Sequence, residues 1–195
     1  SLFAQQASFN YSTRTGSLGS TYSWIDCSSG TQILEGDDVR GSFTLPFDFK
    51  YYDDTYSSGS SISVSSNGFI RFDGLASTNW WSASNYNLIS TGTSFGQIIC
   101  VAMYDGKVRD NGGYCKYLVT GSAPNRVLTI EFSNYEIDYN DNRYANAQVS
   151  LYESTNSIVI KNGTDNINKS GVDQGLHSGV SGYYHKWQEV LSGSS

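Results

Sequence analysis

The sequence predicts an all-β protein: a two-sheet, antiparallel, jelly-roll-like β-sandwich with long polar loops. Phe43, Leu45, Phe47, Phe49 and Tyr51 occupy every second position of one stretch, with polar residues or proline between them. Such alternation is typical of a strand with one buried face. Similar short apolar runs recur along the 195 residues, separated by clusters of Gly, Ser and Asn. At this spacing we expect about ten strands and no substantial helix.

The chain is long enough for one domain with a real core, and we place that domain at residues 8–191. Residues 1–7 resemble the end of an export signal, or else a cloning remnant, and residues 192–195 resemble a linker or tag. The domain could have neighbours in a longer chain.

The first half of the domain contains the stretch with the clearest pattern. Short strands are expected at 8–12 and 31–34, with Trp24 in the loop between them. The strand at 43–51 contains Pro46, which has no N–H for a ladder, so it should lie at a sheet edge or carry a bulge. A hairpin follows, with a three-residue loop at 66–68 and Gly68 in the left-handed conformation. This register pairs Val64 with Ile70 and Ile62 with Phe72, and it buries all four on one face.

The second half continues the same theme. Residues 76–94 form a long polar insertion, and the apolar run 98–103 predicts a central strand covered on both faces. Further strands are expected at 114–120, 127–132, 147–151, 158–160 and about 182–190, with an acidic connection at 135–143.

Charge and cysteine content limit the possible partners. The net charge is −6 and lysine and arginine form no cluster, so a nucleic-acid partner is not expected. No apolar window is long enough for a membrane-spanning helix. Cys100 and Cys115 flank a predicted loop and are either disulfide-bonded or, like Cys27, reduced and partly buried.

Three motifs in order give the chain a family resemblance. They are residues 64–69 after the strand with Pro46, residues 121–132, and residues 147–158. Together they resemble the nidogen-like β-sandwich modules of secreted and cell-surface bacterial proteins, over roughly residues 40–190. The resemblance implies an extracellular module without catalytic residues of its own, often part of a larger adhesin or exported enzyme. Members often carry two aspartates after the strand that corresponds to 98–103, and here Asp105 alone stands there.

An enzyme is not expected. A glycoside hydrolase is the residual alternative, because the two carboxylates of such a site come together only in the fold. His177 and His185 could meet over a hairpin, but no third ligand is spaced beside them, so surface or strand histidines are the preferred interpretation. No nucleophile elbow, phosphate loop or paired Cys-x-x-Cys occurs.

Calcium is the cofactor that the sequence favours, if any. Asp138, Asn140 and Asp141 form one candidate ligand set, and Asp105 and Asp110 form another. Their hard oxygens suit calcium. The alternative, which we weigh more heavily, is that these residues make turns by hydrogen-bonding their own backbone.

The candidate ligand-binding residues are Trp80, Trp81 and Tyr86 in the polar insertion. Aromatic faces beside Asn, Ser and Asp suit sugar rings, and exposed aromatics also mark protein contact surfaces. The alternative is that both indoles fold back over the open end of the sandwich.

These observations lead to three hypotheses. The first is a non-catalytic, secreted or cell-surface binding module at a bacterial surface, acting in adhesion and taking a glycan or surface protein as its partner. The second is a structural spacer or self-assembling surface subunit. The third is an accessory domain of a secreted hydrolase.

Overall fold

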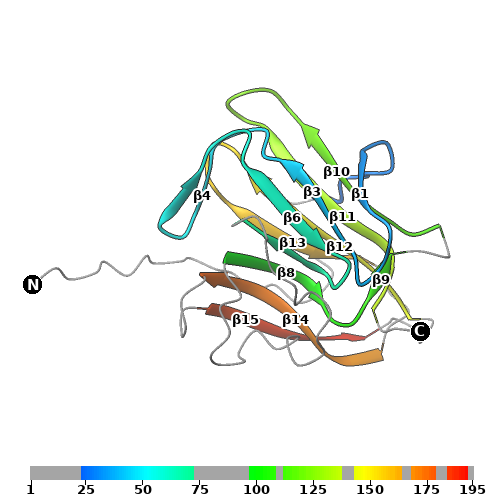
Figure 1. Ribbon diagram of the computed structural model, residues 1–195. Coiled ribbons are helices and arrows are strands. Elements are labelled where there is room, and N and C mark those ends of the chain that lie inside the picture. The colour runs from blue at the N-terminus through cyan, green and yellow to red at the C-terminus, as the bar shows by residue number, and fades with distance from the viewer. Residues whose placement is uncertain are drawn as a thin grey trace, which may run out of the picture.

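The computed structural model describes residues 23–72, 97–108, 112–137, 143–163, 168–178 and 184–192, the last two ranges as backbone apart from Leu176. These residues form fifteen strands and no helix (Figure 1). All pairings are antiparallel, in two large sheets and one small hairpin. The predicted two-sheet antiparallel sandwich is therefore confirmed. None of the described residues forms a helix long and apolar enough to cross a membrane.

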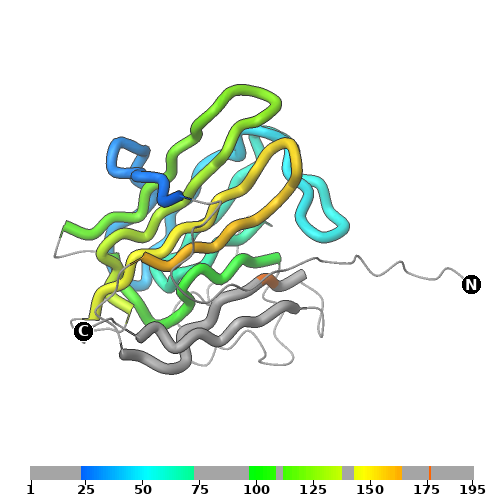
Figure 2. The backbone as a smooth tube through the Cα atoms, turned by 180° about the vertical axis from the view of Figure 1, so that it is seen from behind, coloured from blue at the N-terminus to red at the C-terminus, as the bar shows by residue number. Residues whose placement is uncertain are grey.

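The first sheet, sheet A, has seven strands. Its main path is β1 (Thr31–Leu34), β10 (Tyr114–Thr120), β11 (Val127–Glu136), β12 (Tyr144–Tyr152) and β13 (Ile158–Asn162), and β9 (Lys107–Val108) and β2 (Gly36–Asp37) extend it beside β11. Strands β10 to β13 follow one another as a meander, visible from behind in Figure 2. Their inward residues alternate with outward ones, and the inward set includes Leu128, Ile130 and Phe132.

The second sheet, sheet B, has six strands and faces sheet A across the shared core. In order they are β15 (Tyr184–Ser192), β14 (Asn168–Ser178), β8 (Gln97–Met103), β7 (Phe69–Arg71), β6 (Ser61–Ser65) and β3 (Arg40–Thr44), and a separate hairpin joins β4 (Phe49–Tyr51) to β5 (Asp54–Tyr56). One core cluster contains side chains of both sheets, so the sheets are layers of one body.

The alternating stretch 43–51 is buried as predicted, but it is not one strand. Phe43, Leu45, Phe47, Phe49 and Tyr51 are each at most 8 % exposed. The stretch divides into β3 and β4, with residues 45–48 outside any ladder. This corrects the predicted continuous strand: proline cannot donate a ladder bond, so pairing stops around position 46. The predicted edge position is confirmed for β3, the last strand of sheet B.

The hairpin between β6 and β7 has the predicted register. Val64 pairs with Ile70, and Ile62, Val64, Ile70 and Phe72 are all buried. Gly68 has a φ of 75°. Its carbonyl oxygen accepts hydrogen bonds from Val101 and Ala102, at 2.9 and 3.1 Å, so the turn is attached directly to β8.

Strand β8 is the predicted central strand, and it is buried on both faces. Ile99 and Val101 belong to the main core, whereas Ile98, Cys100 and Met103 form a second buried cluster with Phe69. A run that is apolar at every position fits this location, because neither face meets water.

Strand β14 was not predicted, because no strand was expected between residues 160 and 182. Its sequence mixes Gly, Asp, Gln and Ser with few apolar residues and shows no alternation. Strand β11 also continues to Glu136, past the predicted end at 132, with a bulge before Tyr135. The predicted strand at 8–12 lies outside the described residues.

Candidate functional site

The three predicted ligand-binding aromatics, Trp80, Trp81 and Tyr86, lie outside the described residues, but both attachment points of their insertion are described. The backbone N–H of Phe72 donates to the carbonyl of Gln97 at 3.1 Å. Just before them, Arg71 on β7 pairs with Ile98 on β8. The insertion therefore leaves and rejoins the sandwich at one point, in the middle of sheet B.

Polar contacts from the β4–β5 hairpin hold this attachment point. The Tyr56 hydroxyl donates to the Gln97 side-chain carbonyl, and the Gln97 amide donates to the Asp54 carboxylate. The Tyr51 hydroxyl donates to the carbonyl of Ile98 at 2.5 Å. The Phe72 ring lies 4.6 Å from Tyr51 and 5.0 Å from Tyr56, between ring centroids. The base of the insertion is thus a packed aromatic platform with fixed polar groups.

Of the five predicted calcium ligands, the structure describes Asp105; Asp110, Asp138, Asn140 and Asp141 lie outside the described residues. Asp105 is partly exposed between β8 and β9. No group of three or more His, Cys, Asp or Glu side chains in the described part of the chain is arranged to hold a metal.

A buried ion pair lies close in sequence to both sets of predicted calcium ligands. Lys107 on β9 and Glu136 on β11 are ladder partners, and Lys107 Nζ lies 3.0 Å from a Glu136 carboxylate oxygen. Their side chains are only 7 % and 3 % exposed. Burying such a pair removes water from both charges, so each depends on the other for compensation.

Asn67 in the first family motif has a structural role next to this ion pair. Its side-chain carbonyl accepts the N–H of Gly106 at 3.1 Å, and its own N–H donates to Ser65 Oγ at 3.0 Å. The neighbouring Ser66 Oγ accepts the N–H of Val39, also at 3.0 Å. The buried polar atoms of this motif thus fix the β6–β7 turn to the segments before β3 and β9.

No disulfide joins the three cysteines. Cys100 lies on β8 in sheet B and Cys115 on β10 in sheet A, and all three cysteines are buried. Of the two interpretations left open above, the structure supports the reduced one. The β14–β15 register pairs His177 with Tyr184 and Leu176 with His185, so the two histidines are not cross-strand partners.

A line of four polar residues, which was not predicted, crosses the outward face of sheet A; we call it the polar row. Lys116 pairs with Glu131, Glu131 with Gln148, and Gln148 with Lys161, on four adjacent strands. Glu131 and Gln148 are buried, at 3 % and 0 % exposed, although they face away from the core.

Residues 23–28, the cover segment, bury the polar row by lying along it. Figure 2 shows the start of the described chain, in dark blue, against this face of the sheet. From β13 to β10, Lys161 Nζ donates to the Ser23 carbonyl at 2.7 Å, and the Gln148 amide bonds both the N–H and the C=O of Ile25. The Glu131 carboxylate accepts the Cys27 N–H at 2.8 Å and the Trp24 indole N–H at 3.1 Å. Lys116 Nζ donates to the Ser28 carbonyl at 2.6 Å. Each member of the row therefore contacts the main chain of the cover segment.

Burial determines the electrostatics under the cover segment. Loss of water raises the pKa of the Cys27 thiol to about 12, and the nearby Glu131 carboxylate adds to the rise. Loss of water also raises the pKa of Tyr114 to about 12 and lowers the pKa of Lys161. At neutral pH the Cys27 thiol is therefore protonated and not a nucleophile.

Lys116, Glu131 and Gln148 lie within predicted strands, whereas Lys161 lies one residue past the predicted strand 158–160. What the sequence lacks is the register of three strand pairs, which alone makes these residues neighbours. The same limit hid the role of Trp24, which appeared only as a loop residue.

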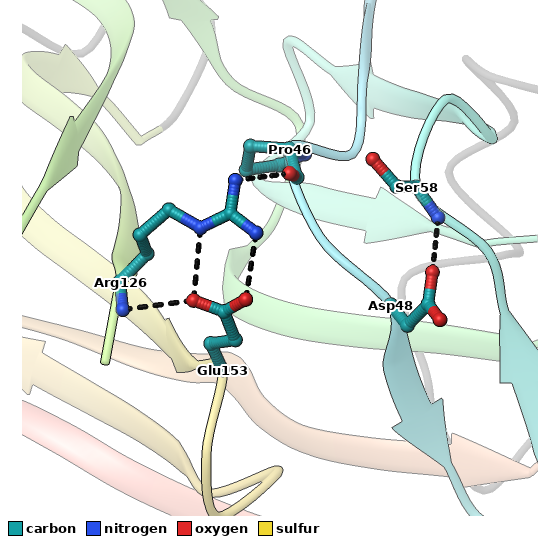
Figure 3. A network of polar contacts seen from close by, with 5 residues as sticks. All are labelled: Pro46, Asp48, Ser58, Arg126 and Glu153. Atoms are coloured by element: carbon teal, nitrogen blue, oxygen red, sulfur yellow. Dashed lines mark hydrogen bonds and ion pairs between the residues drawn. The ribbon is translucent and has the colours of Figure 1, made fainter. Parts of the chain in front are cut away.

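A second polar network joins three chain segments at the other end of sheet A (Figure 3). The Arg126 guanidinium donates to both Glu153 oxygens, at 2.8 and 2.6 Å, and to the Pro46 carbonyl at 2.7 Å. It also lies 5.4 Å from the centre of the Phe47 ring. The network fixes the irregular 45–48 segment against the β12–β13 turn, and nearby Asp48 accepts the N–H of Ser58 at 2.7 Å.

The Arg126–Glu153 pair makes the free energy of unfolding depend on pH in the acidic range. The Arg126 hydrogen bonds lower the pKa of Glu153 below its usual value. A carboxyl with a lowered folded-state pKa contributes stability above its unfolded pKa, about 4.3, and loses it as pH falls through the folded value. We expect Glu153→Gln to remove this contribution, so urea midpoints of wild type and variant should converge below about pH 4. Curves that stay parallel from pH 7 to pH 3 would contradict the assignment.

The fold defines a β-sandwich module with a long insertion in one sheet. A family model described as NIDO related matches residues 10–192. The chain belongs to this NIDO-related family, which confirms the nidogen resemblance of its three motifs. No curated protein and no solved structure matches the chain.

Proposed function

We propose that this chain is a non-catalytic, exported binding module that acts in adhesion at a bacterial cell surface. Its ligand is a glycan or a surface protein, bound by Trp80, Trp81 and Tyr86. The observation that carries the proposal is the attachment of residues 73–96 to a packed platform through Phe72 and Gln97. The family membership supports an extracellular setting.

The aromatic platform at the base of the insertion favours ligand binding, because it fixes both ends of the loop. A ligand-binding loop on a rigid scaffold loses less conformational entropy on binding than a loop whose base also moves. Here both ends of the insertion are fixed by backbone pairing, by the Gln97 contacts and by ring packing on Phe72.

The first test is glycan-array binding of a Trp80→Ala/Trp81→Ala variant. Loss of stacking on a sugar ring should weaken binding by about tenfold or more per ring, because each aromatic contact contributes about 1–3 kcal/mol in comparable stacking sites. Tyr144→Ala is the matched control, since Tyr144 begins β12 at the opposite end of the sandwich. Unchanged binding in the double variant would exclude these residues as the site.

A second proposal, independent of the first, is a calcium site at the Lys107–Glu136 end. The observation that favours it is the ladder pair itself: Asp105 precedes Lys107 by two residues, and Asp138 follows Glu136 by two. The Lys107–Glu136 pair therefore joins, on neighbouring strands, the two segments that carry Asp105 and Asp138 in the sequence. Two aspartates from separate segments, with Asp110, Asn140 and Asp141 nearby in sequence, supply the oxygen donors that calcium prefers.

Calcium binding predicts a metal-dependent melting temperature. At a calcium concentration 100 times its Kd, the ion should add about 2.7 kcal/mol to the free energy of unfolding. The increase should vanish in Asp138→Asn/Asp141→Asn and persist in the control Asp53→Asn, which alters an exposed turn at the other end. Identical thermal scans in calcium and in EDTA would exclude the site.

A further inference from the structure

The cover segment is bound to sheet A as a separate peptide would be. Of the contacts to the polar row, all but the indole bond of Trp24 involve main-chain groups of the segment. Gln148 matches both the N–H and the C=O of Ile25, which is how an amide side chain recognises an extended backbone. The outward face of sheet A is therefore a built peptide site, occupied by the chain's own residues.

The link between this segment and the sandwich is short. The Gly30 N–H donates to the Cys27 carbonyl at 2.8 Å, which closes a tight turn just before β1. A Cβ at Gly30 would lie 2.9 Å from the carbonyl carbon of Tyr117, so the turn is pressed against β10. If the turn opens, residues 23–28 can leave their own row while β1 stays in the sheet.

The charges of the row and the segment are complementary. Lysines stand at both ends of the row and Glu131 inside it. Exposed Asp26 has a lowered pKa, chiefly because Ser28 hydrogen-bonds its carboxylate, with a further contribution from Lys116. Any second copy of the chain carries a segment with the same complementarity.

We propose that the polar row is an exchangeable docking site, in which residues 23–28 of a second copy replace the chain's own segment. Reciprocal exchange gives a two-fold dimer in which the contacts to the polar row are the same as in the monomer but form between copies, with the 27–30 turn open. Once the turn is open, the short link still gives the internal segment an effective concentration in the millimolar range. The chain is therefore monomeric in dilute solution, and it exchanges where copies are crowded or where the internal segment is weakened.

The first experiment is complementation between two full-length variants. Gln148→Ala keeps a normal segment but has a damaged row, and Ile25→Pro keeps a normal row but lacks the N–H that Gln148 accepts. Mixed at high micromolar concentration, they should form a 1:1 heterodimer by native mass spectrometry, whereas each alone stays monomeric. A mixture that remains monomeric, with both variants folded by circular dichroism, overturns the proposal.

The second experiment uses the wild-type chain, so it does not depend on the folding of a variant. A synthetic peptide of residues 23–29, with serine at the cysteine position, is added at millimolar concentration. If it occupies the row, the displaced segment exposes Cys27, whose alkylation by N-ethylmaleimide should accelerate about tenfold or more. Site-resolved mass spectrometry separates Cys27 from Cys100 and Cys115, and a scrambled peptide is the control. An unchanged Cys27 rate overturns the proposal, whatever the result of the glycan array.

Discussion

Replacing Lys107 with methionine should lower the free energy of unfolding by about 3–5 kcal/mol, a large part of the stability of a domain this size. The substitution leaves the Glu136 carboxylate buried, 3 % exposed, without the ammonium that lies 3.0 Å from it. Methionine fills nearly the same volume, so the loss reports on charge and not on a cavity. Urea denaturation at pH 7 measures it.

The double variant Lys107→Met/Glu136→Leu separates the ion pair from its surroundings. With both charges gone, no uncompensated carboxylate remains, and most of the lost stability should return. A double variant as unstable as the single one would show that the pair is required for packing of β9 against β11. The calcium proposal can be tested in the same protein, because the two substitutions leave all the proposed ligands in place.

The features that the sequence predicted are those a single strand or hairpin determines. Burial of Phe47 and Phe49 follows from their spacing, and the Val64–Ile70 register follows from requiring one apolar face across a short loop. Strand β14 was not predicted, because its sequence has little apolar pattern of its own. It forms a strand by pairing with β8 and β15, which flank it in sheet B.

The polar row could not be predicted, because it is a property of four strands together. Lys116, Glu131, Gln148 and Lys161 are separated by 13 to 17 residues in sequence, and nothing in any one strand says which outward residue lies opposite which. The burial of Glu131 further depends on the cover segment, more than 100 residues away. The binding residues Trp80, Trp81 and Tyr86 remain predictions from composition, now with a described point of attachment.

Gly68→Ala should be the most damaging small substitution in the hairpin that the sequence analysis identified. Alanine at a φ of 75° costs roughly 1–2 kcal/mol in backbone strain alone. Its Cβ would also lie 2.7 Å from the carbonyl carbon of Ala102, a backbone atom of the central strand β8 that cannot move independently. We expect a total loss above about 3 kcal/mol in urea denaturation, with the β7–β8 pairing weakened.

Gly59→Ala distinguishes the two contributions. Gly59 has a φ of 90°, but a Cβ there would meet nothing within 4 Å. Its loss should therefore be limited to the strain of a positive φ, roughly 1–2 kcal/mol. The difference between the two variants measures how rigidly the turn at 66–68 is attached to β8. Equal losses would mean that β8 yields at Ala102, and the Gly68 turn would then not be the rigid element that fixes the centre of sheet B.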